Sequence, residues 1–193
     1  MDVNENHALC ASPEWAEYLQ THVLPELADG IELGPRLLEV GPGPGAATDW
    51  LRHRVSSLTA VEIDDEAAEK LRARFPDGNV EGVTGDATQL QWEAGTFDSV
   101  ASFTMLHHVP SRRSQDRILA EALRVLRPGG VLIASDSLPG TGLHEFHVAD
   151  TYNPIEPATL IARLQTIGFG RMTVGVGDSW TVRAFKDDAQ DTP

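Results

Sequence analysis

Residues 37–46 read Leu37-Leu38-Glu39-Val40-Gly41-Pro42-Gly43-Pro44-Gly45-Ala46, an apolar run that leads into alternating glycines. The apolar run predicts a buried strand, and the pattern that begins at Ala46 predicts a helix directly after the turn. Glycine is needed where a chain reverses tightly or where a ligand lies against bare backbone, and three glycines within residues 41–45 meet both needs. The segment therefore predicts a strand, turn and helix that hold a small molecule at the turn.

The spacing of this turn also fits the dinucleotide-binding pattern G-x-G-x-x-G/A, with Gly41, Gly43 and Ala46 at its three positions. Pro42 and Pro44, however, remove two backbone N–H donors from the loop. Fewer donors make a poorer cradle for a pyrophosphate, so the turn favours a ligand without phosphates. A dinucleotide remains the alternative ligand.

An acidic residue precedes the glycines. Glu39 repels a phosphate, but it accepts hydrogen bonds from an ammonium group or orients the loop backbone. Together, Glu39, Gly41, Gly43 and Gly45 resemble the first motif of the class I S-adenosylmethionine-dependent methyltransferases, acid-x-Gly-x-Gly-x-Gly. The resemblance implies that these four residues bind S-adenosylmethionine as a cofactor.

Beyond the turn, strand and helix patterns alternate along the chain. We expect strands over residues 36–40, 57–63, 80–84, 97–103, 131–135, 171–176 and 180–185, and helices over residues 13–27, 46–54, 66–75, 115–126 and 156–166. Such alternation predicts a parallel sheet covered on both faces. The last two strands are separated only by Gly177-Asp178-Ser179, a hairpin connection, so at least one of them runs antiparallel to the rest.

These patterns predict an α/β fold: a single-domain, Rossmann-like, doubly wound sheet of seven strands, mostly parallel, with an antiparallel C-terminal hairpin and helices on both faces. The methyltransferase family ends its sheet in the same way. Within the one expected domain, residues 1–33 form an N-terminal helical cap, residues 34–186 the catalytic core and residues 187–193 a solvated tail.

Composition restricts the class of protein and its partners. The 193 residues, 41% of them hydrophobic, suffice for one domain with a full core. Because we find neither an apolar run of membrane-spanning length nor a basic-then-apolar leader, we expect a cytoplasmic protein without a membrane partner. Cys10 is the only cysteine, so an internal disulfide and a cysteine-based metal cluster are excluded. A net charge of −14 opposes nucleic-acid binding and suits a cationic cofactor.

Acidic residues follow two further strands. In open α/β sheets, ligands bind outside the carboxyl ends of the strands. Glu62 ends the second strand at the distance from the turn at which an acid chelates the hydroxyls of an adenosine ribose, and Ile63 beside it is a candidate cover for the adenine. The resemblance implies that Asp86 accepts from the adenine amino group and that the N–H of Ala87 meets the ring. The alternatives are a solvated acid at Glu62 and a turn-forming aspartate at Asp86.

Residues 97–108 read Phe97-Asp98-Ser99-Val100-Ala101-Ser102-Phe103-Thr104-Met105-Leu106-His107-His108. They resemble the family's fourth-strand segment, which ends with a loop that contacts the cofactor and commonly with a histidine pair. Phe103 is a candidate wall of the cofactor pocket or a plain core residue. His107 and His108 are candidate general bases because imidazole titrates near neutral pH, but either histidine can instead fix the loop by hydrogen bonding to backbone.

Other polar side chains have less defined expectations. Asp136 at the end of the fifth strand and Trp15 on the N-terminal helix are candidates for the acceptor side, Trp15 with the alternative of a core residue. His144 and His147 either face the substrate or are ordinary loop residues. The spacing of these two histidines together with His107 and His108 matches no familiar ligand set, so we expect no metal site. Asp98 is interpreted as structural.

The sequence thus predicts an S-adenosylmethionine-dependent methyltransferase that acts on a small-molecule acceptor. Because the sulfonium donor is already activated, aligning donor and acceptor in a dry pocket can suffice without a dedicated base. Two alternatives stay open: an NAD(P)-dependent oxidoreductase and a non-catalytic S-adenosylmethionine-binding protein. Neither Tyr18 nor Tyr152 begins the Tyr-x-x-x-Lys pair of a short-chain dehydrogenase, and the Asn/Asp-Pro-Pro-Tyr sequence of adenine-methylating enzymes does not follow residue 103.

Overall fold

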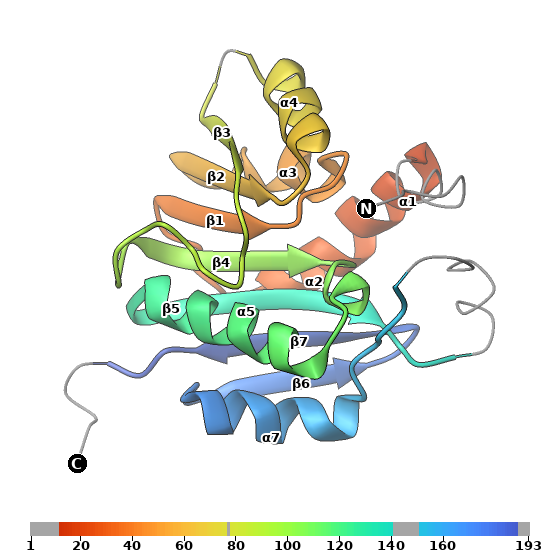
Figure 1. Ribbon diagram of the computed structural model, residues 1–193, viewed down its shortest axis with the longest axis vertical. Helices are drawn as coiled ribbons and strands as arrows, with labels where there is room; N and C mark the ends of the chain where they lie inside the picture. The colour runs from red at the N-terminus through yellow and green to blue at the C-terminus, as the bar shows by residue number, and fades with distance from the viewer. Residues whose placement is uncertain (1–11, 77, 141–150, 189–193) are drawn as a thin grey trace.

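The computed structural model describes residues 12–76, 78–140 and 151–188. Seven strands form one sheet in the order β3-β2-β1-β4-β5-β7-β6 (Figure 1). The strands are β1 (Arg36–Val40), β2 (Ser57–Glu62), β3 (Val80–Thr84), β4 (Phe97–Phe103), β5 (Leu126–Ser137), β6 (Met172–Val176) and β7 (Ser179–Phe185). Only β7 runs against its neighbours, because it pairs antiparallel with both β5 and β6. The predicted fold class, including the antiparallel C-terminal pair, is confirmed.

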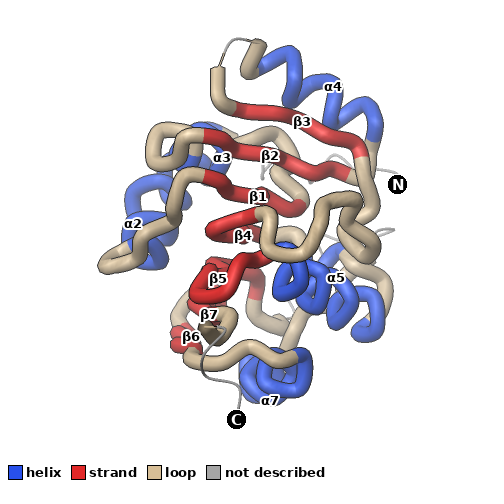
Figure 2. The backbone as a smooth tube through the Cα atoms, turned by 90° about the vertical axis from the view of Figure 1, so that its left-hand side faces the viewer, coloured by secondary structure: helices blue, strands red, loops and turns tan. Residues whose placement is uncertain are grey.

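Helices cover both faces of the sheet, and Figure 2 shows α2 and α3 on one side and α5 on the other. The helical segments are α1 (Pro13–Tyr18), the π-helix η2 (Leu19–Val23), α2 (Leu24–Ala28), α3 (Ala46–Leu51), α4 (Asp65–Arg74), the 3₁₀ turn η3 (Leu106–His108), α5 (Arg112–Val125) and α7 (Pro157–Ile167). Each face has its own apolar core. Leu24, Leu37 and Leu51 belong to one core cluster, and Leu38, Leu119 and Leu160 to the other.

Three differences from the expected elements have local causes. The N-terminal helix contains a π-helical turn in which the N–H of Leu24 bonds to Leu19 O; Pro25, which has no N–H, follows directly. Helix α5 starts before Gln115, because Ser111 caps it by accepting from the N–H of Ser114. Strand β5 starts earlier than expected, because Leu126 already pairs with Phe97 across a register shift.

The parallel register brings the ends of β1, β2 and β3 to one rim of the sheet. Val40 lies beside Val61, and Glu62 beside Thr84. The glycine turn, the acid of β2 and the turn that contains Asp86 therefore lie together at this carboxyl rim, as open α/β sheets require of a ligand site.

Some expectations concern residues that are not described: Cys10, His144 and His147 lie outside the described residues. Within the described ranges, none of the helices is long and apolar enough to cross a membrane.

Candidate cofactor site

The glycine turn has a backbone that only glycine adopts without strain at three positions. Gly41, Gly43 and Gly45 have φ angles of 66°, 51° and 85°. Their N–H groups donate inside the protein: Gly41 to Val61 O at 2.9 Å, Gly43 to the Glu62 carboxylate at 3.3 Å and Gly45 to Pro42 O at 2.9 Å. With these donors used and the two prolines lacking theirs, the turn is a poor cradle for phosphate.

Glu62 connects the end of β2 to the glycine turn. Its Oε2 accepts from the N–H of Gly43, and its Oε1 accepts from the N–H of Ile63 at 2.8 Å. A Cβ on Gly43 would meet nothing within 4 Å, so the backbone of the turn is open beside this carboxylate. Ile63 is 57% exposed at the same rim, which leaves an apolar side chain uncovered next to an acid. An acceptor-only carboxylate between bare backbone and an apolar surface fits a ribose with two hydroxyl donors.

Glu39 lies beneath the turn and is buried, being only 2% exposed. It faces α3, where the hydroxyl of Thr48 donates to Glu39 Oε2 at 2.6 Å. Burial raises the pKa of Glu39 to about 7, against the opposing effect of the Thr48 hydrogen bond, and the charges of Asp49 and Glu62 raise this pKa further. Because the pKa of this carboxyl group lies near neutral pH, a cation bound above the turn would favour its ionised form, and its proton would pass to solvent.

The third predicted acid, Asp86, is exposed after β3, and its Oδ1 accepts from the N–H of Thr88 at 2.8 Å. This is the turn-forming geometry that we weighed as the alternative at this position. Ala87 is half-buried and packs against the core cluster that also contains Val61. The structure thus places both residues at the carboxyl rim of the sheet.

The histidine pair lies at the ends of β4 and β5. His107 is 3% exposed: its Nδ1 contacts Asp136 Oδ1, and its N–H donates to Asp136 Oδ2 at 2.9 Å. The carboxylate also accepts from the N–H of Ser137 at 2.6 Å. His107 therefore ties the loop after β4 to the tip of β5. His108 is half-buried, with its ring centroid 4.0 Å from that of His107.

Two other candidate residues lie in less direct positions. The side chain of Phe103 is 6% exposed in the core cluster on the α3 face, so only its backbone is placed at the rim. Asp98 lies near the start of β4, at the rim opposite the glycine turn, where it accepts from the N–H of Arg36 at 2.9 Å and from Arg127 Nε at 2.6 Å. Asp98 joins strand ends, in keeping with the structural interpretation.

Thr104, between Phe103 and the histidine loop, has strained backbone. Among the described residues it is the one non-glycine residue with positive φ, at 49°. A β-branched residue in this region is an outlier, and such outliers gather at functional sites. Its N–H donates to Ser135 O at 2.9 Å, which holds the strained residue against β5.

This strain gives a stability prediction. Because both substitutions delete the Thr104 side chain, Thr104→Gly and Thr104→Ala differ mainly in backbone strain. We expect the glycine variant to be the more stable of the two by about 1 kcal/mol, since only glycine adopts this φ freely. Urea unfolding of both variants measures the difference, and a more stable alanine variant would contradict the strain.

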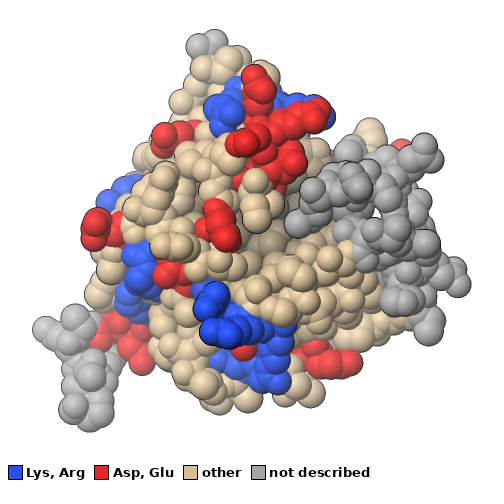
Figure 3. Space-filling view, in the orientation of Figure 1, with Lys and Arg blue, Asp and Glu red and all other residues tan. Residues whose placement is uncertain are grey.

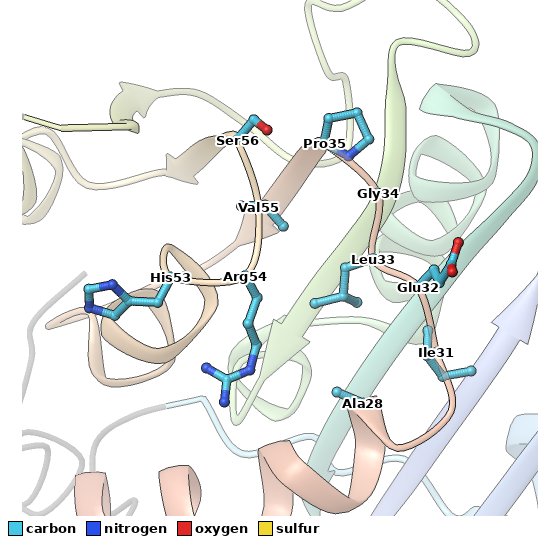
Figure 4. Close-up of a pocket in the computed structure, with 10 residues that line it drawn as sticks. All are labelled: Ala28, Ile31, Glu32, Leu33, Gly34, Pro35, His53, Arg54, Val55 and Ser56. Carbon is cyan, nitrogen blue, oxygen red and sulfur yellow. The ribbon is translucent and has the colours of Figure 1, made fainter.

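A separate hollow of about 730 Å³ lies at the opposite rim, between residues 28–35 and 53–56 (Figure 4). Figure 4 shows the polar ends of Glu32 and His53 pointing in different directions, away from a common centre. Arg54 Nη1 donates a hydrogen bond to the backbone carbonyl of Trp50 at 2.9 Å. The hollow therefore has no convergent polar groups, and the site with convergent chemistry is the carboxyl rim.

Several known proteins are similar to this chain in sequence. The family model described as a methyltransferase domain matches residues 38–134. A fatty-acid O-methyltransferase of Mycolicibacterium smegmatis is 31% identical over 125 residues, which cover 64% of this chain and 44% of that protein. A ribosomal RNA small subunit methyltransferase A of Geobacter metallireducens is 46% identical over 72 residues, 36% of this chain and 26% of that protein. The chain thus spans less than half of either relative.

A similar fold is found in a solved structure. A crystal structure of a SAM-dependent methyltransferase from Methanosarcina mazei superimposes with a TM-score of 0.73 at 18% identity, covering 85% of this chain and 98% of that one. At this identity the likeness concerns the fold. It includes the sheet whose carboxyl rim carries the glycine turn.

Proposed function

The chain belongs to the S-adenosylmethionine-dependent methyltransferases, and on that premise we propose that it transfers the methyl group of this cofactor to a small-molecule acceptor. The observation that carries the proposal is the contact between the Glu62 carboxylate and the N–H of Gly43, which joins an acid to the open backbone of the turn. When bound, the cofactor supplies a methyl group that is activated by its positively charged sulfur.

The residues at the rim suit the chemical parts of S-adenosylmethionine. Glu62 would accept from the ribose hydroxyls, and Ile63 would cover the adenine. Asp86 would accept from the adenine amino group through the oxygen that does not close its own turn, with the N–H of Ala87 facing the ring. Buried Glu39 would balance the positive charge of the ammonium group above the turn, where a phosphate would be repelled.

A small-molecule acceptor is favoured by the charge of the whole chain, which is −14. Acidic side chains at the start of α4, Asp65, Glu66 and Glu69, lie beside basic residues farther along the same helix (Figure 3). The excess of acidic residues over the chain repels the phosphates of RNA, whereas it has no penalty for a neutral acceptor. The fatty-acid relative supports this class of acceptor, and the RNA-methylating relative makes RNA the competing class.

Calorimetric titration with S-adenosylhomocysteine tests cofactor binding, and a screen of acceptors with radiolabelled S-adenosylmethionine tests transfer. We expect binding, followed by label transfer to fatty acids or other small acceptors but not to ribosomal RNA. Absence of binding would overturn the proposal. Binding without transfer to any acceptor would identify a non-catalytic binding protein, and NADH binding in a fluorescence titration would favour the oxidoreductase.

The position of Glu39 predicts a pH dependence of cofactor binding. Its pKa is raised from 4.5 to about 7, so between these two pH values the folded protein holds a proton that the unfolded chain has released. The stability of the folded protein therefore falls as the pH rises towards 7. A bound ammonium group would favour the ionised carboxylate over the protonated form that burial favours.

We expect the affinity for S-adenosylhomocysteine to fall by about tenfold from about pH 7.5 to about pH 6, with release of up to about one proton on binding. Calorimetry at the lower pH in two buffers of different ionisation enthalpy measures the released proton. Glu39→Gln retains a hydrogen-bonding side chain without a titrating group, so its affinity should change little with pH. Equal proton release by wild type and variant would contradict the role of Glu39.

A further inference from the structure

Met105 lies directly against the first glycine of the turn. A Cβ built on Gly41 would come within 2.2 Å of Met105 Cγ, 3.0 Å of its Cβ and 3.4 Å of its Sδ. The methionine side chain therefore occupies the space that any larger residue at Gly41 would need. Met105 is half-buried and packs against the core cluster that contains Val40, Val61 and Leu106.

Two consecutive residues of β5 anchor the backbone on either side of Met105. Before it, the N–H of Thr104 donates to Ser135 O at 2.9 Å. After it, the N–H of His107 donates to Asp136 Oδ2 at 2.9 Å, and the ring of His107 contacts the same carboxylate. These anchors explain how a threonine at a φ of 49° persists, since strained backbone needs surroundings that over-determine it.

We propose that Met105 is a cofactor-contacting residue, the apolar wall of the S-adenosylmethionine site at Gly41, and that Asp136 is a positioning residue that holds this wall in place through His107. The inference rests on the proposed function. It assigns the buried pair of His107 and Asp136 to shaping the cofactor site, which extends the loop-fixing alternative given for His107 and replaces its candidate role as a general base. A wall fixed before binding removes the entropic cost of ordering it on binding.

The first test replaces Met105 by alanine and titrates with S-adenosylhomocysteine. We expect Met105→Ala to bind about tenfold more weakly, because the ligand loses apolar contact, and Met105→Leu, of similar volume, to bind within about threefold of wild type. Met172→Ala is the matched control: Met172 is also half-buried against the same core cluster, but it lies on the edge strand β6. This control should leave affinity within about twofold.

The second test concerns Asp136, which accepts from the backbone N–H groups of His107 and Ser137 and also contacts the ring of His107, a set of partners that an amide cannot satisfy equally. Asp136→Asn alone should weaken binding of S-adenosylhomocysteine. In the Asp136→Asn background, Met105→Ala should weaken binding by much less than it does in the wild-type background, because the two residues act through one wall. Fully additive losses would overturn the positioning role of Asp136.

The outcomes separate this inference from the proposed function. If wild type does not bind S-adenosylhomocysteine, the proposed function fails. If wild type binds and Met105→Ala binds equally well, the function stands and the wall is overturned. Met105→Ala truncates a half-buried side chain, and thermal melting of this variant and of Met172→Ala checks that both fold. The binding test with Met105→Ala therefore decides the proposal even if Asp136→Asn does not fold.

Discussion

Replacing Glu62 by alanine is expected to weaken binding of S-adenosylhomocysteine by about a hundredfold, because a hydrogen-bonded charged partner contributes roughly 1.5–3 kcal/mol. The substitution removes the proposed acceptor of the ribose hydroxyls. It also removes the carboxylate that accepts from the N–H of Gly43 at 3.3 Å, so the turn loses one of its fixed points. Isothermal titration calorimetry of wild type and variant measures the loss.

Glu69→Ala is the control for the effect of net charge on binding. It removes an exposed glutamate from α4 and changes the net charge by the same amount. This control should bind within about twofold of wild type, because interactions between exposed charges are largely screened by salt. Glu62→Gln should fall between wild type and Glu62→Ala, since its amide keeps one acceptor oxygen without the charge. An alanine variant that binds as wild type does would remove Glu62 from the site.

The sequence was sufficient to predict where Glu62 and the glycine turn meet, because parallel strands end at a common rim and the acid follows its strand directly. It was not sufficient to predict what lies against Gly41. Met105 is separated from Gly41 by 64 positions, and its contact depends on a left-handed threonine, which is contrary to the local preference of a β-branched residue. The local preferences of residue types do not predict the backbone at such strained positions, which often lie at functional sites.

Arg163 shows the same limit away from the site. Its helix α7 was predicted over residues 156–166, with Pro157 in its first turn and Gly168 closing it. An arginine in a surface helix is expected to lie in solvent. Arg163 is instead 6% exposed. Its partners are on α5, some 47 positions away in sequence. The periodicity of a sequence does not predict side-chain pairs that are so far apart.

Arg163 joins α7 to the loops beside the site through a chain of polar contacts. Its Nε donates to Asp116 Oδ1 at 2.7 Å and its Nη2 to Gln115 Oε1 at 2.9 Å. Gln115 is 1% exposed, and its Nε2 donates to Leu106 O at 3.0 Å and to Asn153 O at 2.7 Å. Because both ends of this amide are occupied, its orientation is fixed, and it holds residues 106 and 153 together.

Replacing Arg163 by methionine, which has a similar apolar stem, is therefore expected to destabilise the fold by about 3 kcal/mol. The substitution leaves the buried Gln115 oxygen without its donor and removes the closest cation from Asp116, which retains Arg112 at 3.8 Å. Because Asp116 is partly exposed, water offsets part of its loss, and the unsatisfied amide accounts for most of the effect. The midpoint of urea unfolding at unchanged m-value measures the difference.

Arg113→Met is the matched control, since it makes the same substitution at an exposed position of α5. It should change stability by less than about 0.5 kcal/mol, as surface substitutions do. Gln115→Met, which removes the amide itself, should make Arg163→Met much less costly when the two are combined, because the unsatisfied oxygen is then absent. Equal effects of Arg163→Met and Arg113→Met would show that the buried arginine is held by packing of its stem alone, and additive effects with Gln115→Met would show that the amide is not what the arginine satisfies.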